Sequence, residues 1–275
     1  MRFWSIRGLF PCLFVALCAS APGGEVVRVG GSGAGLGGLQ ALANAFEQRH
    51  PSRSILILPS IGSSGGIRAV MDGKLDVGCT SRPLHPEERV PGLAEVPWVT
   101  TPFAFATHPG TPPEELTLPG IEDIYAGRRT RWRDGTPIRL ILRPKSDGAF
   151  SYLASLSPSM RAALDHAHAL PGVSVGITDQ EALAQLEKTP GSFGTTVLGL
   201  VVSERRQVQA LRVNGAHPSD PAYPFFLTLS LVHRPGTASA AVRDFLTFVG
   251  SKDGRRILLK AGYRPHPDTP PGKGR

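Results

Sequence analysis

Hydrophobic positions in the N-terminal part of the chain alternate between strand and helix patterns. Glu25 to Val29 alternates polar and β-branched residues, and Ile55 to Leu58 is a continuous apolar run that predicts a strand buried on both faces. Between them, apolar residues at helical spacing over 39–46 predict an amphipathic helix. A second helix from Ile67 to Gly73 and a short strand from Asp76 to Thr80 follow. This β-α-β-α-β order predicts a parallel sheet with helices on its faces.

The same alternation continues through the rest of the chain. The expected strands are 98–107, 138–142, 193–197 and 225–232, and the expected helices are 114–126, 149–153, 160–170, 180–186 and 242–249. Because strands alternate with helices throughout, we predict an α/β protein of two similar layers.

The N-terminus has the pattern of an export signal. Two arginines precede the apolar stretch Gly8 to Ala19, which is too short to span a membrane, and Ala19-Ser20-Ala21 is a small-x-small cleavage site. We therefore predict a signal peptide over 1–21 and a periplasmic or secreted protein. Lipoprotein anchoring through Cys18 is the alternative, but the bulky Leu17 before it is unfavourable.

Composition narrows the class of protein. The chain has 275 residues, 41% of them apolar and 19% charged, which suits a folded protein of one or two domains. The net charge of +8 favours anions, but no basic run with interleaved aromatic residues indicates nucleic acid. Once the signal is removed, Cys79 is the one cysteine left, which excludes an intramolecular disulfide and suggests a buried small hydrophobe. The Pro/Gly-rich tail 266–275 is expected to be disordered.

Three turns share one design, in which a strand is followed by Gly and Ser residues and then by a helix. They are Gly31–Gly35, Gly62–Gly66 and Arg143–Gly148. The N-terminus of a helix exposes unpaired N–H groups with partial positive charge, and glycines let an anion approach them. Arg143 adds a planar, charged fork that suits an oxyanion. The three turns are predicted to converge on one buried oxyanion. The alternative is three ordinary turns in which Ser63 and Ser146 cap helices.

Two enzyme motifs also match. Gly33 to Gly38 fits G-x-G-x-x-G, but the strand that follows ends in Pro59-Ser60, without the acidic residue that binds a ribose. Gly62 to Gly66 fits G-x-S-x-G, in which Ser64 would be the nucleophile of a secreted serine hydrolase. The candidate partners of Ser64 are His217 or His233 and Asp165 or Asp179. No metal site is expected, because His166 and His168, the most closely spaced histidines, point apart on a helix. No cofactor is expected either.

An ordered set of motifs over residues 25–265 resembles the phosphate-binding proteins of ABC transporters. The motifs are Gly31–Gly33, Ile61–Ile67, Leu75–Leu84, Ile124–Gly127 with Trp132 and Pro137–Ile138, Arg143–Gly148, Tyr223–Pro224, Phe245–Val249 and Gly262–Pro265.

The resemblance implies an α/β, two-lobed periplasmic-binding-protein fold, with a mixed sheet flanked by helices in each lobe and the ligand in the cleft. Lobe 1 would comprise 22–103 and 228–265, and lobe 2 would comprise 104–227. The implied protein is a monomer and not an enzyme, and it captures inorganic phosphate or a similar oxyanion for the permease of an ABC importer. A binding-fold protein with a changed ligand or a regulatory role is the alternative.

The resemblance also implies roles by position. Ser63 and Arg143 match ligand-binding residues, and Gly148 and Leu36 match backbone donors. Four positions depart from the family: Gly35 replaces a threonine, Ser81 an acceptor aspartate, Asp147 a serine and Ala149 a threonine. Asp147 is a candidate for the lost acceptor role, which would favour an oxyanion that still carries a proton. The expected ligand-binding residues are Gly35, Leu36, Ser63, Ser81, Arg143, Asp147 and Gly148.

Overall fold

The computed structural model describes residues 25–267. The predicted signal peptide with Cys18 and the tail beyond residue 267 lie outside the described residues. His266 donates a backbone hydrogen bond to the carbonyl of Trp98 at 2.9 Å. None of the helices in the described range is long and apolar enough to cross a membrane.

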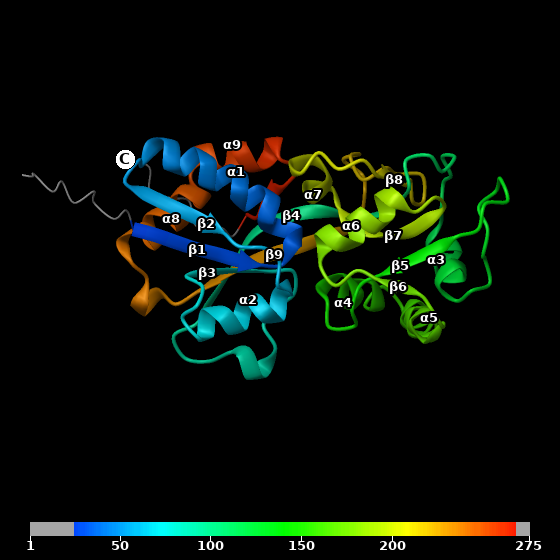
Figure 1. The fold of residues 1–275 in the computed structure, drawn as a ribbon, viewed down its shortest axis with the longest axis horizontal. Helices are drawn as coiled ribbons and strands as arrows, with labels where there is room; N and C mark the ends of the chain where they lie inside the picture. Colours follow the sequence, from blue (N-terminus) through cyan, green and yellow to red (C-terminus); the bar gives the residue numbers. More distant parts are fainter. Residues whose placement is uncertain (1–24, 268–275) are drawn as a thin grey trace, which may run out of the picture.

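Two halves lie side by side, each with its own part of a mixed β-sheet (Figure 1). In lobe 1, three parallel strands are continued by antiparallel ones. These strands are β2 (Arg53–Ile57), β1 (Glu25–Gly31), β3 (Val77–Thr80), β9 (Phe226–His233), β4 (Ala94–Thr107) and β10 (Arg264–Pro265). The parallel β1–β2–β3 arrangement confirms the order predicted for the N-terminal part.

The sheet of lobe 2 begins on the second half of β4. Its other strands are β7 (Ser192–Val197), β5 (Arg139–Leu142), β6 (Ser174–Val175) and β8 (Gln209–Ala210). β4 therefore belongs to both lobes: Pro102 is paired with Phe226 of β9, and the next residue, Phe103, is paired with Val197 of β7. The chain passes between the lobes a second time in the segment that contains Tyr223 and leads into β9. The Tyr223 hydroxyl donates a buried hydrogen bond to the carbonyl of Phe103 at 2.8 Å, which links this segment to β4.

Helices cover the faces of both parts of the sheet (Figure 1). Those of lobe 1 are α1 (Gly33–Arg49), α2 (Gly62–Met71), α8 (Ala240–Gly250) and α9 (Lys252–Lys260). Those of lobe 2 are α3 (Leu118–Tyr125), α4 (Gly148–Ala154), α5 (Pro158–Ala169), α6 (Asp179–Lys188) and α7 (Leu198–Ser203). Short 3₁₀ turns lie at Pro86–Glu88 and Pro235–Thr237. The sequence patterns did not predict α7 or α9.

Two predictions about elements are wrong in detail. β2 lies at the edge of the sheet, and its Leu56 is 48% exposed, so this strand is not buried on both faces. An apolar run does not distinguish an edge strand from a central one, because the difference depends on which strand pairs next to it. The helix expected from Glu114 begins only at Leu118, where the Thr117 side chain caps it. Glu114 is buried before it and pairs with Arg129.

The ring of Tyr263 joins α1 to α7. It is fully buried and stacks on Trp98, with ring centroids 6.3 Å apart. Glycines make room for it on both helices, since a Cβ atom would lie 2.9 Å from the ring at Gly38 and 2.4 Å at Gly199. The Tyr263 hydroxyl donates to the carbonyl of Ala34 at 2.8 Å. The C-terminal segment thus fixes the first turn of α1, where the candidate site begins.

Candidate functional site

The first turn of α1 faces lobe 2. Ser32 occupies the N-cap position of this helix, but its side chain makes no capping hydrogen bond. Its N–H donates to the carbonyl of Cys79 at 2.8 Å, and its buried Oγ has no hydrogen-bond partner among the described residues. A Cβ atom on Gly33 would lie 2.9 Å from Asp179 Oδ2, so a side chain there would prevent the close approach of α6. The N-terminus of a 17-residue helix, with its partial positive charge, is therefore directed at the junction of the lobes.

The second turn brings two serines together. Ser63, in the first turn of α2, accepts a hydrogen bond from the N–H of Ser81 at 3.0 Å, and the two hydroxyl oxygens are 3.1 Å apart. Both residues are buried. Gly148 of lobe 2 packs directly on Ser81, because a Cβ atom at Gly148 would lie 2.4 Å from the Ser81 hydroxyl. Ser81 therefore lies between Ser63 of its own lobe and Gly148 of lobe 2.

Arg143 follows β5 and is only 5% exposed. Its Nη1 donates to the carbonyl of Gly176 at 2.6 Å, and its Nη2 donates to Asp147 Oδ2 at 2.8 Å. Nε has no partner among the described residues. Since a guanidinium has five N–H donors, these two bonds fix its plane and leave donors for a further acceptor. Arg143 is thus a rigidly held, buried cation at the lobe junction.

Two carboxylates accompany this cation. Asp147 caps α4: its Oδ1 accepts from the N–H of Ala149 at 2.9 Å, while its Oδ2 is held by Arg143. Asp179 is the first residue of α6, and its Oδ2 lies 3.5 Å from Nη2 of Arg143. This oxygen is enclosed and has no hydrogen-bond partner among the described residues. Each oxygen of Asp147 therefore has a hydrogen-bond partner within lobe 2, whereas Oδ2 of Asp179 has only the longer ion pair with Arg143.

The charge of Asp179 is poorly compensated. Burial raises the pKa of its carboxyl group to about 6, because the charged form loses hydration. The positive charge of Arg143 lowers the pKa of Asp179, whereas the negative charge of Asp147 raises it further. Burial likewise raises the pKa of the Cys79 thiol on β3 to about 12, and the Asp179 charge adds to this effect. Cys79 is therefore a neutral core residue, as expected.

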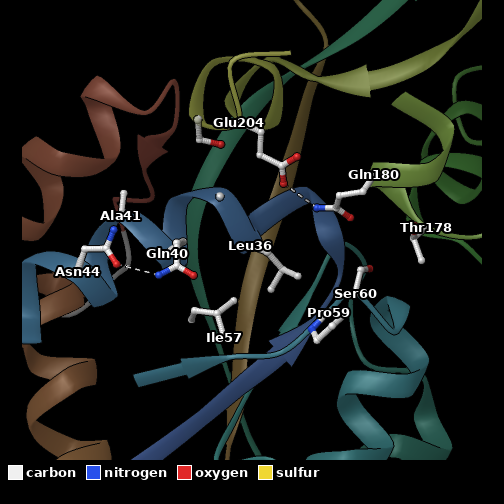
Figure 2. Close-up of a pocket in the computed structure, with 12 residues that line it drawn as sticks. Leu36, Gln40, Ala41, Asn44, Ile57, Pro59, Ser60, Thr178, Gln180 and Glu204 are labelled. Atoms are coloured by element: carbon white, nitrogen blue, oxygen red, sulfur yellow. Dashed lines mark hydrogen bonds between the residues drawn. The ribbon is translucent and has the colours of Figure 1, made fainter. Parts of the chain in front are cut away.

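Two of the sequence-predicted residues lie away from this cluster. A Cβ atom on Gly35 would lie 2.5 Å from the Cys79 sulfur, so this position faces the core of lobe 1 and has no room for a threonine. Leu36 lines a groove of about 510 Å³ between the lobes, which Figure 2 shows together with Ile57 and Pro59 below α1. Gln180 lies at one end of the groove and donates to Glu204 at 2.9 Å and to the carbonyl of Gly33 at 3.3 Å. The groove and the Arg143 cluster are thus neighbouring but distinct features.

Sequence reasoning missed Ser32 as a separate group and assigned Asp179 to no binding role. A serine within the glycine-rich turn, directly before the predicted helix, was the signal for Ser32. For Asp179, the acidic start of a helix was visible, but such residues usually favour the helix dipole and indicate nothing more. The position of Asp179 against α1 depends on how the two lobes pack, which a local sequence pattern does not show.

Neither His217 nor His233 is hydrogen-bonded to Ser64, so the hydrolase alternative has no base in place among the described residues. Ser64 Oγ accepts a hydrogen bond from Arg82 Nη2 at 2.8 Å, and Arg82 is paired with Glu88. His217 is bonded to Ser219 instead. An arginine does not remove a proton from a serine, so this arrangement does not activate Ser64. The dinucleotide motif fails as well, because Gly33 to Gly38 lies entirely inside α1.

Comparisons with known proteins agree with this geometry. The model of the family described as the PBP superfamily domain matches residues 19–253. The phosphate-binding protein PstS of Borreliella burgdorferi is 24% identical over 214 residues, which cover 74% of this chain and 76% of that protein.

Two solved structures share the fold. A Clostridium perfringens protein, solved with bound phosphate and named as a phosphate ABC transporter substrate-binding protein, superposes with a TM-score of 0.75 at 24% identity and covers 88% of this chain and 100% of its own. An ABC-type phosphate transport receptor of Vibrio cholerae gives a TM-score of 0.62 at 20% identity, covering 86% and 99%. At these identities the likeness establishes the two-lobed architecture.

Proposed function

Because the chain belongs to the family of the PBP superfamily domain, we propose that it is an exported solute-binding protein that captures phosphate or a related oxyanion between its lobes. The relatives are binding proteins by name, and this chain is not an enzyme. The proposed partner is the permease of an ABC importer, which the names of these relatives suggest, and the proposed state is a monomer delivered through the signal peptide 1–21.

The observation that carries the proposal is the buried Arg143 at the junction of the lobes. Its guanidinium is held by Gly176 and Asp147 and retains unused donors. The N-terminus of α1 lies across from it, with the Ser32 hydroxyl buried and unpartnered. The Ser63–Ser81 pair completes the donor set from lobe 1. Donors from two lobes around a buried cation suit an oxyanion, which accepts hydrogen bonds in several directions.

The names of the relatives support phosphate as the first choice among oxyanions. Gly35, Ser81, Asp147 and Ala149 differ from the family pattern, which leaves related anions within the proposal. We propose that Ser63, Ser81, Arg143 and Gly148 surround the ligand, with Leu36 at the edge of the site and Gly35 in a packing role.

Isothermal titration against phosphate, arsenate, sulfate and a phosphonate tests this function. Phosphate affinity should fall by roughly 30-fold or more in Arg143→Ala, since truncating a buried, charge-assisted contact costs about 2–5 kcal/mol. Arg143→Lys should also weaken binding, because the planar fork is lost. The matched control is Arg139→Ala on the same strand, where the side chain is exposed and bonds only the carbonyl of Pro190.

Circular dichroism of each variant separates loss of binding from loss of fold. If folded Arg143→Ala bound phosphate as tightly as the wild type, the proposed site would be excluded. A fluorophosphonate probe should leave Ser64 unlabelled, whereas labelling would favour the hydrolase alternative.

A further inference from the structure

Asp179 joins the two lobes through its carboxylate. The group lies against the first turn of α1 in lobe 1, since a Cβ atom on Gly33 would be 2.9 Å from its Oδ2. On the side of lobe 2, its Oδ2 lies 3.5 Å from Nη2 of Arg143. The α1 N-terminus and Arg143 are the groups that we assign to the ligand. A carboxylate of the protein itself thus lies beside the groups that an incoming anion needs, although its Oδ2 accepts no hydrogen bond from any described residue.

Polar groups around this junction lack partners among the described residues. Asp179 Oδ2 is enclosed without a hydrogen bond, and so are the Ser32 hydroxyl and Nε of Arg143. Ser32 is 1% exposed and Arg143 is 5% exposed, so both groups are well removed from solvent. Unsatisfied buried donors carry a free-energy cost that an added acceptor would remove. The Asp179 carboxylate therefore leaves the hydrogen-bonding capacity of Ser32 and Arg143 partly unused.

The groups that face Asp179 stabilise its negative charge only weakly, so the carboxylate is readily protonated. Arg143, after β5, attracts the carboxylate, whereas Asp147 at the start of α4 repels it. Cys79 on β3 is an uncharged thiol. Gln180, next to Asp179 on α6, is neutral but bonds Glu204, which directly follows α7. Burial raises the pKa of Asp179 to about 6. The group therefore changes charge in slightly acidic solution.

We propose that Asp179 is a built-in competitor of the ligand: its negative charge beside the α1 N-terminus and Arg143 opposes an incoming anion, and an oxyanion binds to these groups when the carboxyl group is neutral. The inference rests on the proposed function, because it concerns the same site. Binding then takes up one proton from solvent onto the Asp179 carboxyl group, and departure of the anion releases it. Affinity falls as pH rises through the range in which Asp179 loses its proton.

The expected effect follows from the proton equilibrium of Asp179. At pH 5 most molecules carry the neutral form, whereas at pH 7.5 about one in 30 does. Asp179→Asn keeps a neutral side chain of nearly the same shape at every pH. It should bind inorganic phosphate about as tightly as the wild type at pH 5 and roughly 30-fold more tightly at pH 7.5. The ionisation of phosphate itself affects both proteins equally and cancels in the comparison.

Titration calorimetry with inorganic phosphate from pH 5 to pH 8 tests the proposal. Asp179→Ala is a second neutral variant, in case the asparagine disturbs the fold, and circular dichroism reports the fold of both. The control is Asp165→Asn in the same lobe, whose carboxylate pairs with Lys145 and Arg161 at the surface and should leave the pH profile unchanged. Equal or weaker binding by the neutral Asp179 variants at pH 7.5 would overturn the proposal. Weaker binding would instead make Asp179 an acceptor for the ligand.

The two proposals fail in distinguishable ways. If the wild type binds neither phosphate, arsenate nor sulfate at any of these pH values, the proposed function fails and the competitor role falls with it. If the wild type binds phosphate through Arg143 and the Asp179 variants retain its pH profile, the competitor role alone is wrong.

Discussion

Asp147 uses both of its carboxylate oxygens inside lobe 2, one as the cap of α4 and one as a partner of Arg143. This arrangement favours the capping role over the acceptor role that the family comparison suggested. Asp147→Ser should therefore leave the ratio of phosphate to sulfate affinity unchanged at pH 5, where Asp179 is mostly neutral. Because serine also caps helices, the main loss should come from leaving the buried Arg143 without this carboxylate partner, which costs about 3–5 kcal/mol. Titration calorimetry and urea unfolding measure the two effects. A shift of the ratio toward sulfate would restore the acceptor role.

Asp179 should also leave a signature in the stability of the ligand-free protein. The unfolded-state pKa of an aspartate is about 3.9, and burial raises the folded-state pKa to about 6. The folded protein therefore binds more protons between these values, and the contribution of Asp179 to stability is lost as pH rises from about 4 to 6. The loss is at most about 3 kcal/mol. Asp179→Asn should lack it and gain stability over the wild type near pH 7.

Urea unfolding of both proteins at pH 4, 5, 6 and 7 measures this difference. Comparing the variant with the wild type is necessary because other groups have the opposite slope. The hydrogen bond from Arg82 lowers the pKa of Glu88, for example, so its contribution is lost as pH falls. Parallel curves for the two proteins would show that the carboxyl group of Asp179 titrates as it does in an unfolded chain.

At the scale of elements, the contact between α1 and α7 orients the helix that carries the site. The ring of Tyr263 lies between the two helices and bonds the carbonyl of Ala34. Gly199→Ala would place a methyl group 2.4 Å from this ring, so the ring or α7 must move. Overpacking of this kind costs typically about 1–3 kcal/mol, and phosphate affinity should fall because the first turn of α1 shifts.

Gly236→Ala is the matched control for this substitution, since a Cβ atom at Gly236 meets nothing within 4 Å. Urea unfolding and titration calorimetry of the two variants provide the comparison. If Gly199→Ala had the same free energy of unfolding as Gly236→Ala and bound phosphate with wild-type affinity, the packing of Tyr263 between α1 and α7 would not position α1.

At the scale of the whole molecule, β4 and the segment that leads into β9 connect the lobes, and the proposed ligand would bridge the two lobes (Figure 1). A ligand that binds only the folded protein stabilises it by mass action, by about 2.7 kcal/mol at a concentration of 100 times Kd. Phosphate at this excess should therefore raise the thermal midpoint by several degrees in the wild type. Arg143→Ala should show little shift at the same concentration. Scanning calorimetry measures the midpoints, and an equal shift in both proteins would place phosphate elsewhere.

Sequence patterns determined the order of strands and helices in the chain, because hydrophobic periodicity is a local property. The glycine- and serine-rich turns with Arg143 could be singled out for the same reason, since a turn that follows a strand and opens a helix is visible in a short segment. The motif order over 25–265 then indicated the family, and the match to residues 19–253 confirmed it.

Tertiary structure decided the features that depend on residues far apart in the chain. It placed β2 at the edge of the sheet, directed Gly35 into the core against Cys79, and tied both oxygens of Asp147 within its own lobe. It also brought Asp179 against the first turn of α1, which lies about 145 residues earlier. Local pattern contains no information about such a contact, because it arises where one lobe packs on the other. The chemistry of a site between lobes is set by that packing.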